Sequence, residues 1–133
     1  MDDENTAVTR TLDRRVILIG AFNGLFFALP AAILQRTVFS GTAMASVMLA
    51  IIFFSGALAG YAAARPLPPH ALPHGAVAGL ITFLGAEVVY LLATRNFSNP
   101  IVLLLGIILF ALVFASLGTI GAMVAVSRGS RVR

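Results

Sequence analysis

The chain of 133 residues contains no cysteine and no tryptophan, and only 11% of its side chains are charged. Without cysteine there is no disulfide framework, no thiolate metal site and no redox motif. A soluble domain carries roughly 25% charged residues, so this chain has too little charge to cover a surface that faces water. The composition therefore excludes a soluble globular protein and favours a protein that is covered by lipid.

The charge that is present is mostly basic. Nine basic residues, all arginine, stand against five acidic residues and give a formal net charge of +4. Each arginine lies in a tail or beside the end of an apolar segment. A nucleic-acid-binding protein needs a continuous basic patch or stripe, and the sequence has none. We therefore expect no nucleic-acid partner.

Four long apolar runs make up most of the chain, over residues 16–35, 42–64, 74–94 and 101–126. About 20 residues of helix cross a hydrocarbon core of ~30 Å, whereas the strands of a membrane barrel alternate in segments of about ten. Backbone groups in lipid also need hydrogen-bond partners within their own segment. The sequence predicts an all-α integral membrane protein, a bundle of four transmembrane helices.

Short polar segments flank and join these runs. We expect residues 1–15 to form a disordered tail and residues 127–133 to form a basic tail. The link over residues 65–73 contains four prolines, which predict a stiff extended segment in place of helix.

The arginines set the expected orientation. Seven of the nine lie before the first run, in the link between the second and third runs, or after the fourth run. With four spans these three regions lie on one side of the membrane, and arginine accumulates in cytoplasmic loops. We therefore expect a multi-pass protein of the plasma membrane with both termini in the cytoplasm.

Glycines recur at helical spacing near one end of every run. Small residues let helix backbones approach closely in lipid, where no hydrophobic effect drives helices together. With the topology above they all fall in the cytoplasmic half, which predicts a glycine zipper there. The strongest expectation is that the glycines of the second run face those of the third. The predicted packing residues are Gly20, Gly24, Gly56, Gly60, Gly75, Gly79, Gly118 and Gly121.

The two halves of the chain share a short similarity. Residues 20–29 align with residues 75–84 and match at five of ten positions. We attribute this match to chance similarity among segments of few residue types. Two hairpins related by duplication, as in transporters built from parallel repeats, are the alternative.

A resemblance rests on the second and third runs. Residues 55–61 (SGALAGY) and 74–80 (HGAVAGL) surround a polar break. They resemble the central hairpin of small four-helix bacterial and archaeal membrane proteins of unknown function, in which GxxAG ends the second helix and HGxxAG opens the third. The resemblance covers about a quarter of the chain. It implies a membrane location and no known activity.

Glu87 is the only acidic residue within the four runs. No arginine lies at its depth, so we expect its carboxyl group to be neutral at pH 7 and to hydrogen-bond to Tyr90, one turn later on the same face. Gln35 and Ser46 are candidates from neighbouring helices. An acid within a span marks a proton or cation pathway by default. The alternative is a neutral acid that ties two helices or two subunits together.

The other polar residues in or beside the runs are weaker candidates for a functional site than Glu87. Asn23 is expected to hydrogen-bond to a second helix. His70 and His74 are four residues apart, but proline separates them and no third ligand accompanies them. We expect no metal, no cofactor and, since no catalytic motif is present, no enzymatic activity.

Two functional interpretations remain. The first, which the sequence favours, is a structural or accessory subunit that interacts with other membrane proteins. The second is a small oligomeric transporter or channel that uses Glu87. Both predict the lipid bilayer, and a second copy or a larger membrane complex, as partners. A dry helix contact around Glu87 would favour the first interpretation, and a water-filled interior would favour the second.

Overall fold

The structure, a computed structural model, describes residues 12–66, 70–94 and 99–130. These residues form four helices, each long and apolar enough to cross a membrane. The chain is therefore an all-α four-helix membrane bundle, as the apolar runs predicted. Its helices are α2 (Arg14–Thr37), α3 (Met44–Ala64), α4 (Ala71–Thr94) and α5 (Pro100–Ser130).

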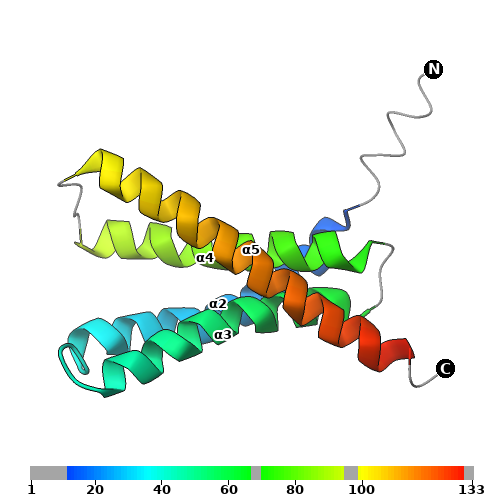
Figure 1. Ribbon diagram of the computed structural model, residues 1–133, viewed down its shortest axis with the longest axis horizontal. Coiled ribbons are helices and arrows are strands. Elements are labelled where there is room, and N and C mark those ends of the chain that lie inside the picture. Colours follow the sequence, from blue (N-terminus) through cyan, green and yellow to red (C-terminus); the bar gives the residue numbers. More distant parts are fainter. Residues whose placement is uncertain (1–11, 67–69, 95–98, 131–133) are drawn as a thin grey trace.

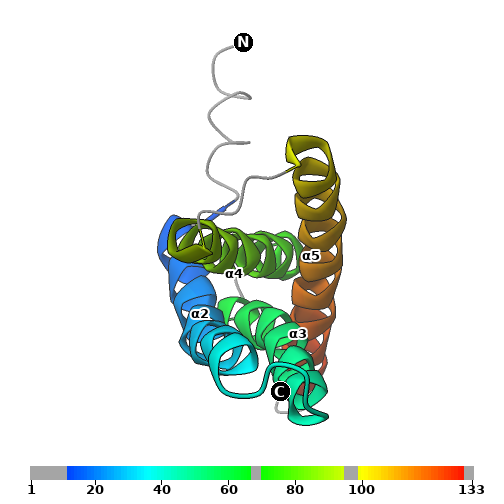
Figure 2. The ribbon, with the colours of Figure 1, turned by 90° about the vertical axis from the view of Figure 1, so that its left-hand side faces the viewer.

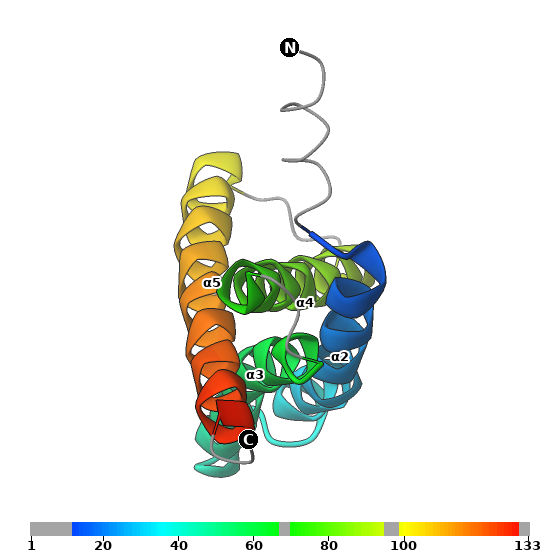
Figure 3. The ribbon, with the colours of Figure 1, turned by 90° about the vertical axis from the view of Figure 1, so that its right-hand side faces the viewer.

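The four helices form two hairpins, α2–α3 and α4–α5, that diverge toward one end of the molecule (Figure 1). We call this end, which carries Thr37 and Pro100, the splayed end. The opposite end, which carries Arg14 and Ser130, we call the terminal end. Figure 2 views the bundle from the splayed end, and Figure 3 views it from the terminal end. Among the described helices, every pair is in contact except α2 and α5.

Helix α2 begins earlier than the apolar run predicted. The side chain of Asp13 accepts a hydrogen bond of 2.9 Å from the backbone N–H of Arg15 and so caps the helix. Asparagine, aspartate and serine are strongly preferred at this position because they satisfy an N–H group that has no acceptor within the helix. The expected tail over residues 1–15 therefore ends at the cap, and its first eleven residues lie outside the described part.

Helix α4 also begins before its expected start. The extended link predicted over residues 65–73 was wrong for its last part, because Ala71 to Pro73 are helical. Pro73 occupies the third helical position, where the backbone N–H of any residue has no acceptor within the helix. Proline therefore removes no hydrogen bond there. His70, just before the helix, has a positive φ of 60°.

Helix α5 has 31 residues and spans about 46 Å at 1.5 Å per residue. It continues through Ser127 to Ser130, so the expected basic tail begins as helix. An apolar helix longer than the ~30 Å hydrocarbon core tilts or extends beyond it. Figure 1 shows α5 crossing the other helices obliquely.

The helices meet most closely around Gly118 of α5. A Cβ atom added to Gly60 of α3 would overlap the carbonyl group of Gly118, and one added to Gly118 would overlap the carbonyl group of Gly75 of α4. The Cα atom of Gly79 would also lie only 3.2 Å from that added atom. Backbone therefore packs directly on backbone, and α5 holds α3 and α4 together at the terminal half.

These contacts correct one expectation. The glycines of α3 do not face the glycines of α4, because each pair faces α5. Gly56 packs against the ring of Phe114, 2.8 Å from an added Cβ atom, and Gly121 packs against the carbonyl group of Ala57. Helix α5 has small residues of its own, so the glycine faces of α3 and α4 each pack more closely against α5 than against each other.

The two hairpins share a register of internal contacts. In the first hairpin, Gly20 packs against Ala63 and Gly24 against Ala59. In the second hairpin, Gly75 packs against Gly118 and Gly79 against Phe114. Every residue of the second set follows its counterpart at one constant offset along the chain. A shared register of this kind is what a duplication of the hairpin would produce.

Candidate functional site

A pocket of about 180 Å³ lies between the hairpins, where they begin to diverge toward the splayed end. All four helices contribute side chains to it. At ~30 Å³ for each water molecule, its volume corresponds to roughly six waters. The pocket is therefore large enough for a small solute.

Four phenylalanine rings form the floor of this pocket. Phe53 of α3, Phe83 of α4, and Phe110 and Phe114 of α5 pack with ring centroids 5.3 to 6.2 Å apart. Phe83 and Phe114 are buried, and Phe114 also packs on Gly56 at the glycine contacts. The floor thus separates the pocket from the tightly packed terminal half.

Polar side chains from the two hairpins form the rim. Gln35 and Arg36 come from α2, and Glu87 and Tyr90 come from α4. Arg36 Nη1 donates a hydrogen bond of 2.9 Å to the Tyr90 hydroxyl oxygen. The guanidinium carbon of Arg36 also lies 3.9 Å from the centroid of the Tyr90 ring. This contact joins the two hairpins across the splayed end.

Arg36 corrects the expectation that no cation is near Glu87. Arg36 and Glu87 line the same pocket. The sequence predicted that Arg36 lies in the link after the first run, but α2 continues through Thr37. The long arginine side chain therefore extends from a helix end onto Tyr90. The sequence did contain a signal for this contact, because Arg36 and Tyr90 both lie near the C-terminal ends of their apolar runs.

A second, polar depression of about 350 Å³ adjoins the rim. It shares Gln35 and Arg36 with the pocket and is otherwise lined by Ser40, Gly41 and Ala45 at the α2–α3 turn. The positive φ of 74° at Gly41 suits glycine and lets the chain turn tightly there. The depression and the pocket therefore lie on either side of the Gln35 and Arg36 side chains.

Asn23 and Ser46 lie outside the site. Asn23 is exposed, and its amide donates a hydrogen bond of 2.8 Å to the Ile19 carbonyl oxygen one turn earlier. The expected bond to a second helix was wrong, because a short amide side chain can satisfy itself on its own backbone. Ser46 is exposed on α3. Of the neighbours expected near Glu87, only Gln35 and Tyr90 line its pocket.

Two polar residues that are buried in the core have structural roles. The backbone N–H of Asp13 donates to His74 Nε2 at 2.8 Å, which leaves His74 Nδ1–H to donate to the His70 carbonyl oxygen at 2.9 Å. The Thr82 hydroxyl donates to the Ala78 carbonyl oxygen at 2.9 Å. Among the described residues, no three potential metal ligands gather at one place. The hydrogen bonds of the His74 ring therefore join the start of α2 to the start of α4.

The rim brings polar side chains of the two hairpins together above an aromatic floor. A carboxyl group, a guanidinium group, a phenol and an amide can bind ammonium and carboxylate groups. The rings can hold an apolar body. Within the part of the chain that the structure describes, this is the arrangement best suited to a small solute. No protein-family model, no curated protein and no solved structure matches this chain.

Proposed function

We propose that the protein is a small membrane transporter whose binding site is the pocket around Glu87. One observation carries this proposal. Glu87 lines a pocket between two diverging hairpins, together with Arg36, Tyr90 and Gln35. An intramembrane acid that faces a cavity is typical of substrate and ion pathways.

The chemistry of the pocket suits a small zwitterion with an apolar body. Glu87 would bind an ammonium group and Arg36 a carboxylate. The guanidinium group carries five N–H donors, so its bond to Tyr90 leaves donors for a ligand. The phenylalanine floor would contact the apolar body. A purely cationic solute would leave Arg36 unpaired, and a purely anionic one would leave Glu87 unpaired.

Coupling to protons follows from the single carboxyl group. Glu87 can hold a proton or pair with an ammonium group, but not both, so solute binding would release one proton to the solution. Alternating access would come from rocking of one hairpin against the other. The shared contact register of the hairpins and the close packing at the terminal half support this motion, since repeats of this kind move as units in transporters.

We propose that the protein lies in the plasma membrane, with the splayed end outside the cell and the terminal end in the cytoplasm. Support comes from the sequence, in which seven of the nine arginines precede the first apolar run, follow the fourth or lie in the link between the second and third, because arginine accumulates on the cytoplasmic side. In this orientation the pocket would open outward.

The accessory role that the sequence favoured stays a second candidate. The pocket between the two hairpins supports it, because this pocket can also receive side chains of a second copy or of a partner subunit. In that case Glu87 would donate a hydrogen bond to the incoming helix.

Binding of three solutes that share one aromatic body tests the transporter proposal. We expect phenylalanine to bind the purified protein more tightly than phenethylamine, which lacks the carboxylate, or 3-phenylpropionate, which lacks the amine. A charge-assisted hydrogen bond contributes about 1.5–3 kcal/mol, so each missing group should weaken binding roughly tenfold or more. Isothermal titration calorimetry in detergent measures the three affinities.

The same measurement separates the two candidates. Binding of phenethylamine as tightly as phenylalanine would show that Arg36 takes no part. If none of the three binds and the protein purifies with a second chain, the accessory role replaces the transporter. Uptake of labelled phenylalanine into liposomes, driven by a proton gradient, then distinguishes transport from binding alone.

A further inference from the structure

A second groove, of about 420 Å³, lies between α3 and α5 at the terminal end. Its walls are apolar side chains such as Phe54 and Leu58 of α3 and Val124 of α5. Phe54 is 67% exposed and Val124 is 41% exposed. The groove therefore opens sideways, toward the hydrocarbon that surrounds the bundle, and is separate from the pocket at Glu87.

Close backbone packing makes this groove deep. A Cβ atom added to Gly121 would overlap the carbonyl group of Ala57, so the base of the groove is formed by two helix backbones in contact. From Phe54 to Tyr61 the groove follows α3 for about 10 Å, at 1.5 Å per residue. This length is about a third of a ~30 Å hydrocarbon core.

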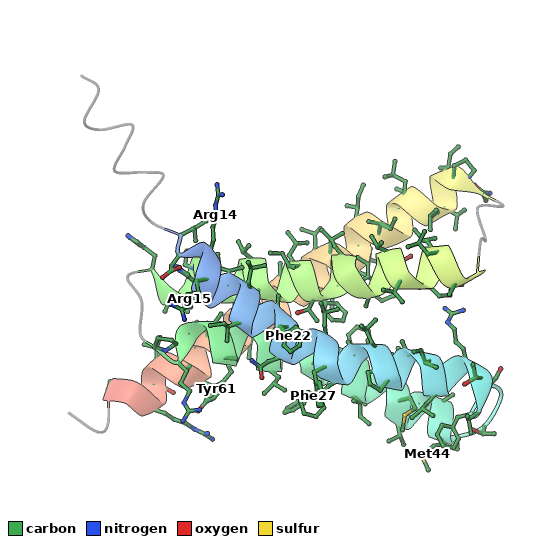
Figure 4. All side chains as sticks on the ribbon, turned by 180° about the vertical axis from the view of Figure 1, so that it is seen from behind. Arg14, Arg15, Phe22, Phe27, Met44 and Tyr61 are labelled. Carbon is green, nitrogen blue, oxygen red and sulfur yellow. The ribbon has the colours of Figure 1, made fainter. Side chains whose placement is uncertain are left out.

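The groove is polar at only one end. Arg128 and Tyr61 line it there, with the guanidinium carbon 5.9 Å from the centroid of the tyrosine ring. Figure 4 shows Tyr61 at the same end of the bundle as Arg14 and Arg15. The groove thus changes from apolar to cationic in the direction in which a lipid monolayer changes from acyl chain to headgroup.

We propose that this groove binds one anionic phospholipid of the leaflet at the terminal end. Its phosphate would pair with Arg128 and accept a hydrogen bond from the Tyr61 hydroxyl, while one acyl chain would lie against Leu58 and Val124. Charge complementarity selects this occupant, because arginine near the headgroups attracts anionic lipid by about 1 kcal/mol. A helix from another chain would instead leave the guanidinium group without an anion.

Native mass spectrometry of the detergent-purified protein tests this site. The lipids to add are dioleoyl phosphatidylglycerol, which is anionic, and dioleoyl phosphatidylcholine, which has the same chains and no net charge. We expect one phosphatidylglycerol to remain bound at activation energies that remove phosphatidylcholine. Its apparent affinity should be about fivefold higher, the factor that about 1 kcal/mol represents.

Matched variants locate the site. Arg128→Gln should remove the preference for phosphatidylglycerol. Arg14→Gln removes the same charge at the same end of the bundle but from α2, on the side away from Tyr61 (Figure 4), and should keep the preference. Val124→Trp fills the groove from an exposed position and should lower the affinity for both lipids.

Three results would overturn the proposal. Equal retention of the two lipids by the unaltered protein would exclude headgroup recognition. An equal loss in Arg14→Gln and Arg128→Gln would show attraction by net charge with no defined site. A dimer that adds no lipid, and that Val124→Trp converts to monomer, would show that a second copy fills the groove.

Discussion

Replacing Gly118 by alanine should destabilise the bundle by about 3 kcal/mol, the upper end of the usual cost of overpacking. The added methyl group would overlap the Gly75 carbonyl group and approach Gly79. Both neighbours are backbone, so neither can move without shifting α4. Moving α5 away would also open its contact with Gly60 of α3. One methyl group should therefore loosen three helices at once.

Gly106→Ala is the matched control, on the same helix and with the same change. A Cβ atom added at Gly106 meets nothing within 4 Å, so we expect an effect within about 0.5 kcal/mol, as at surface positions. The free energy of unfolding in mixed micelles, titrated with a denaturing detergent, measures both variants. Equal loss in the two would remove the claim that Gly118 is the centre of the packing.

Glu87→Gln should weaken solute binding at least tenfold and leave the stability of the fold nearly unchanged. Glutamine keeps a hydrogen-bond donor and acceptor but lacks the negative charge that strengthens the bond from an ammonium group. The pocket leaves room for the side chain, so no packing is lost. We expect phenylalanine and phenethylamine to bind at least tenfold more weakly, the factor for about 1.4 kcal/mol, with an unchanged melting temperature by circular dichroism.

Arg36→Gln gives the complementary result. It should weaken binding of phenylalanine to the level of phenethylamine and leave phenethylamine almost unaffected, because only the carboxylate partner is lost. Difference infrared spectroscopy adds a direct observation, since the protonated carboxyl band of Glu87 should disappear when phenylalanine binds. A Glu87→Gln variant that binds phenylalanine normally, or that unfolds, would show that the acid has a structural role only.

The sequence predicted the architecture because the length of an apolar run depends on hydrocarbon thickness, which is the same for every membrane protein. The glycine positions also stood out, because only small residues allow close helix contact in lipid. Their partners did not, since Gly60 and Gly79 carry no information about which helix they face. Only the three-dimensional path of α5 assigns both to Gly118.

The candidate site was predicted in part. Glu87 and Tyr90 were evident because polar residues are rare within spans. Arg36 was not, because its position in a link hid the reach of its side chain onto Tyr90. Asn23 was misassigned, since a sequence does not state whether an amide bonds to its own helix or to another. How far a side chain extends, and whether it hydrogen-bonds to its own helix, depend on three-dimensional geometry. The spacing of residues in the sequence does not specify either.

Reaction of two single cysteines with a membrane-impermeant maleimide tests whether the pocket at Glu87 holds water and opens outward. The chain has no cysteine of its own, so Ala86→Cys and Val88→Cys need no altered background. Both flank Glu87 at nearly the same depth. Ala86 lines the pocket, whereas Val88 is 55% exposed on the outer surface, where lipid would cover it.

We expect a membrane-impermeant maleimide added to intact cells to label Ala86→Cys and to leave Val88→Cys unlabelled, although Val88 is exposed in the isolated bundle. Added phenylalanine should slow the reaction of Ala86→Cys by occupying the pocket. If Ala86→Cys stays unlabelled from outside under all these conditions, the space around Glu87 is dry or faces the cytoplasm, and the proposed outward-facing site is contradicted.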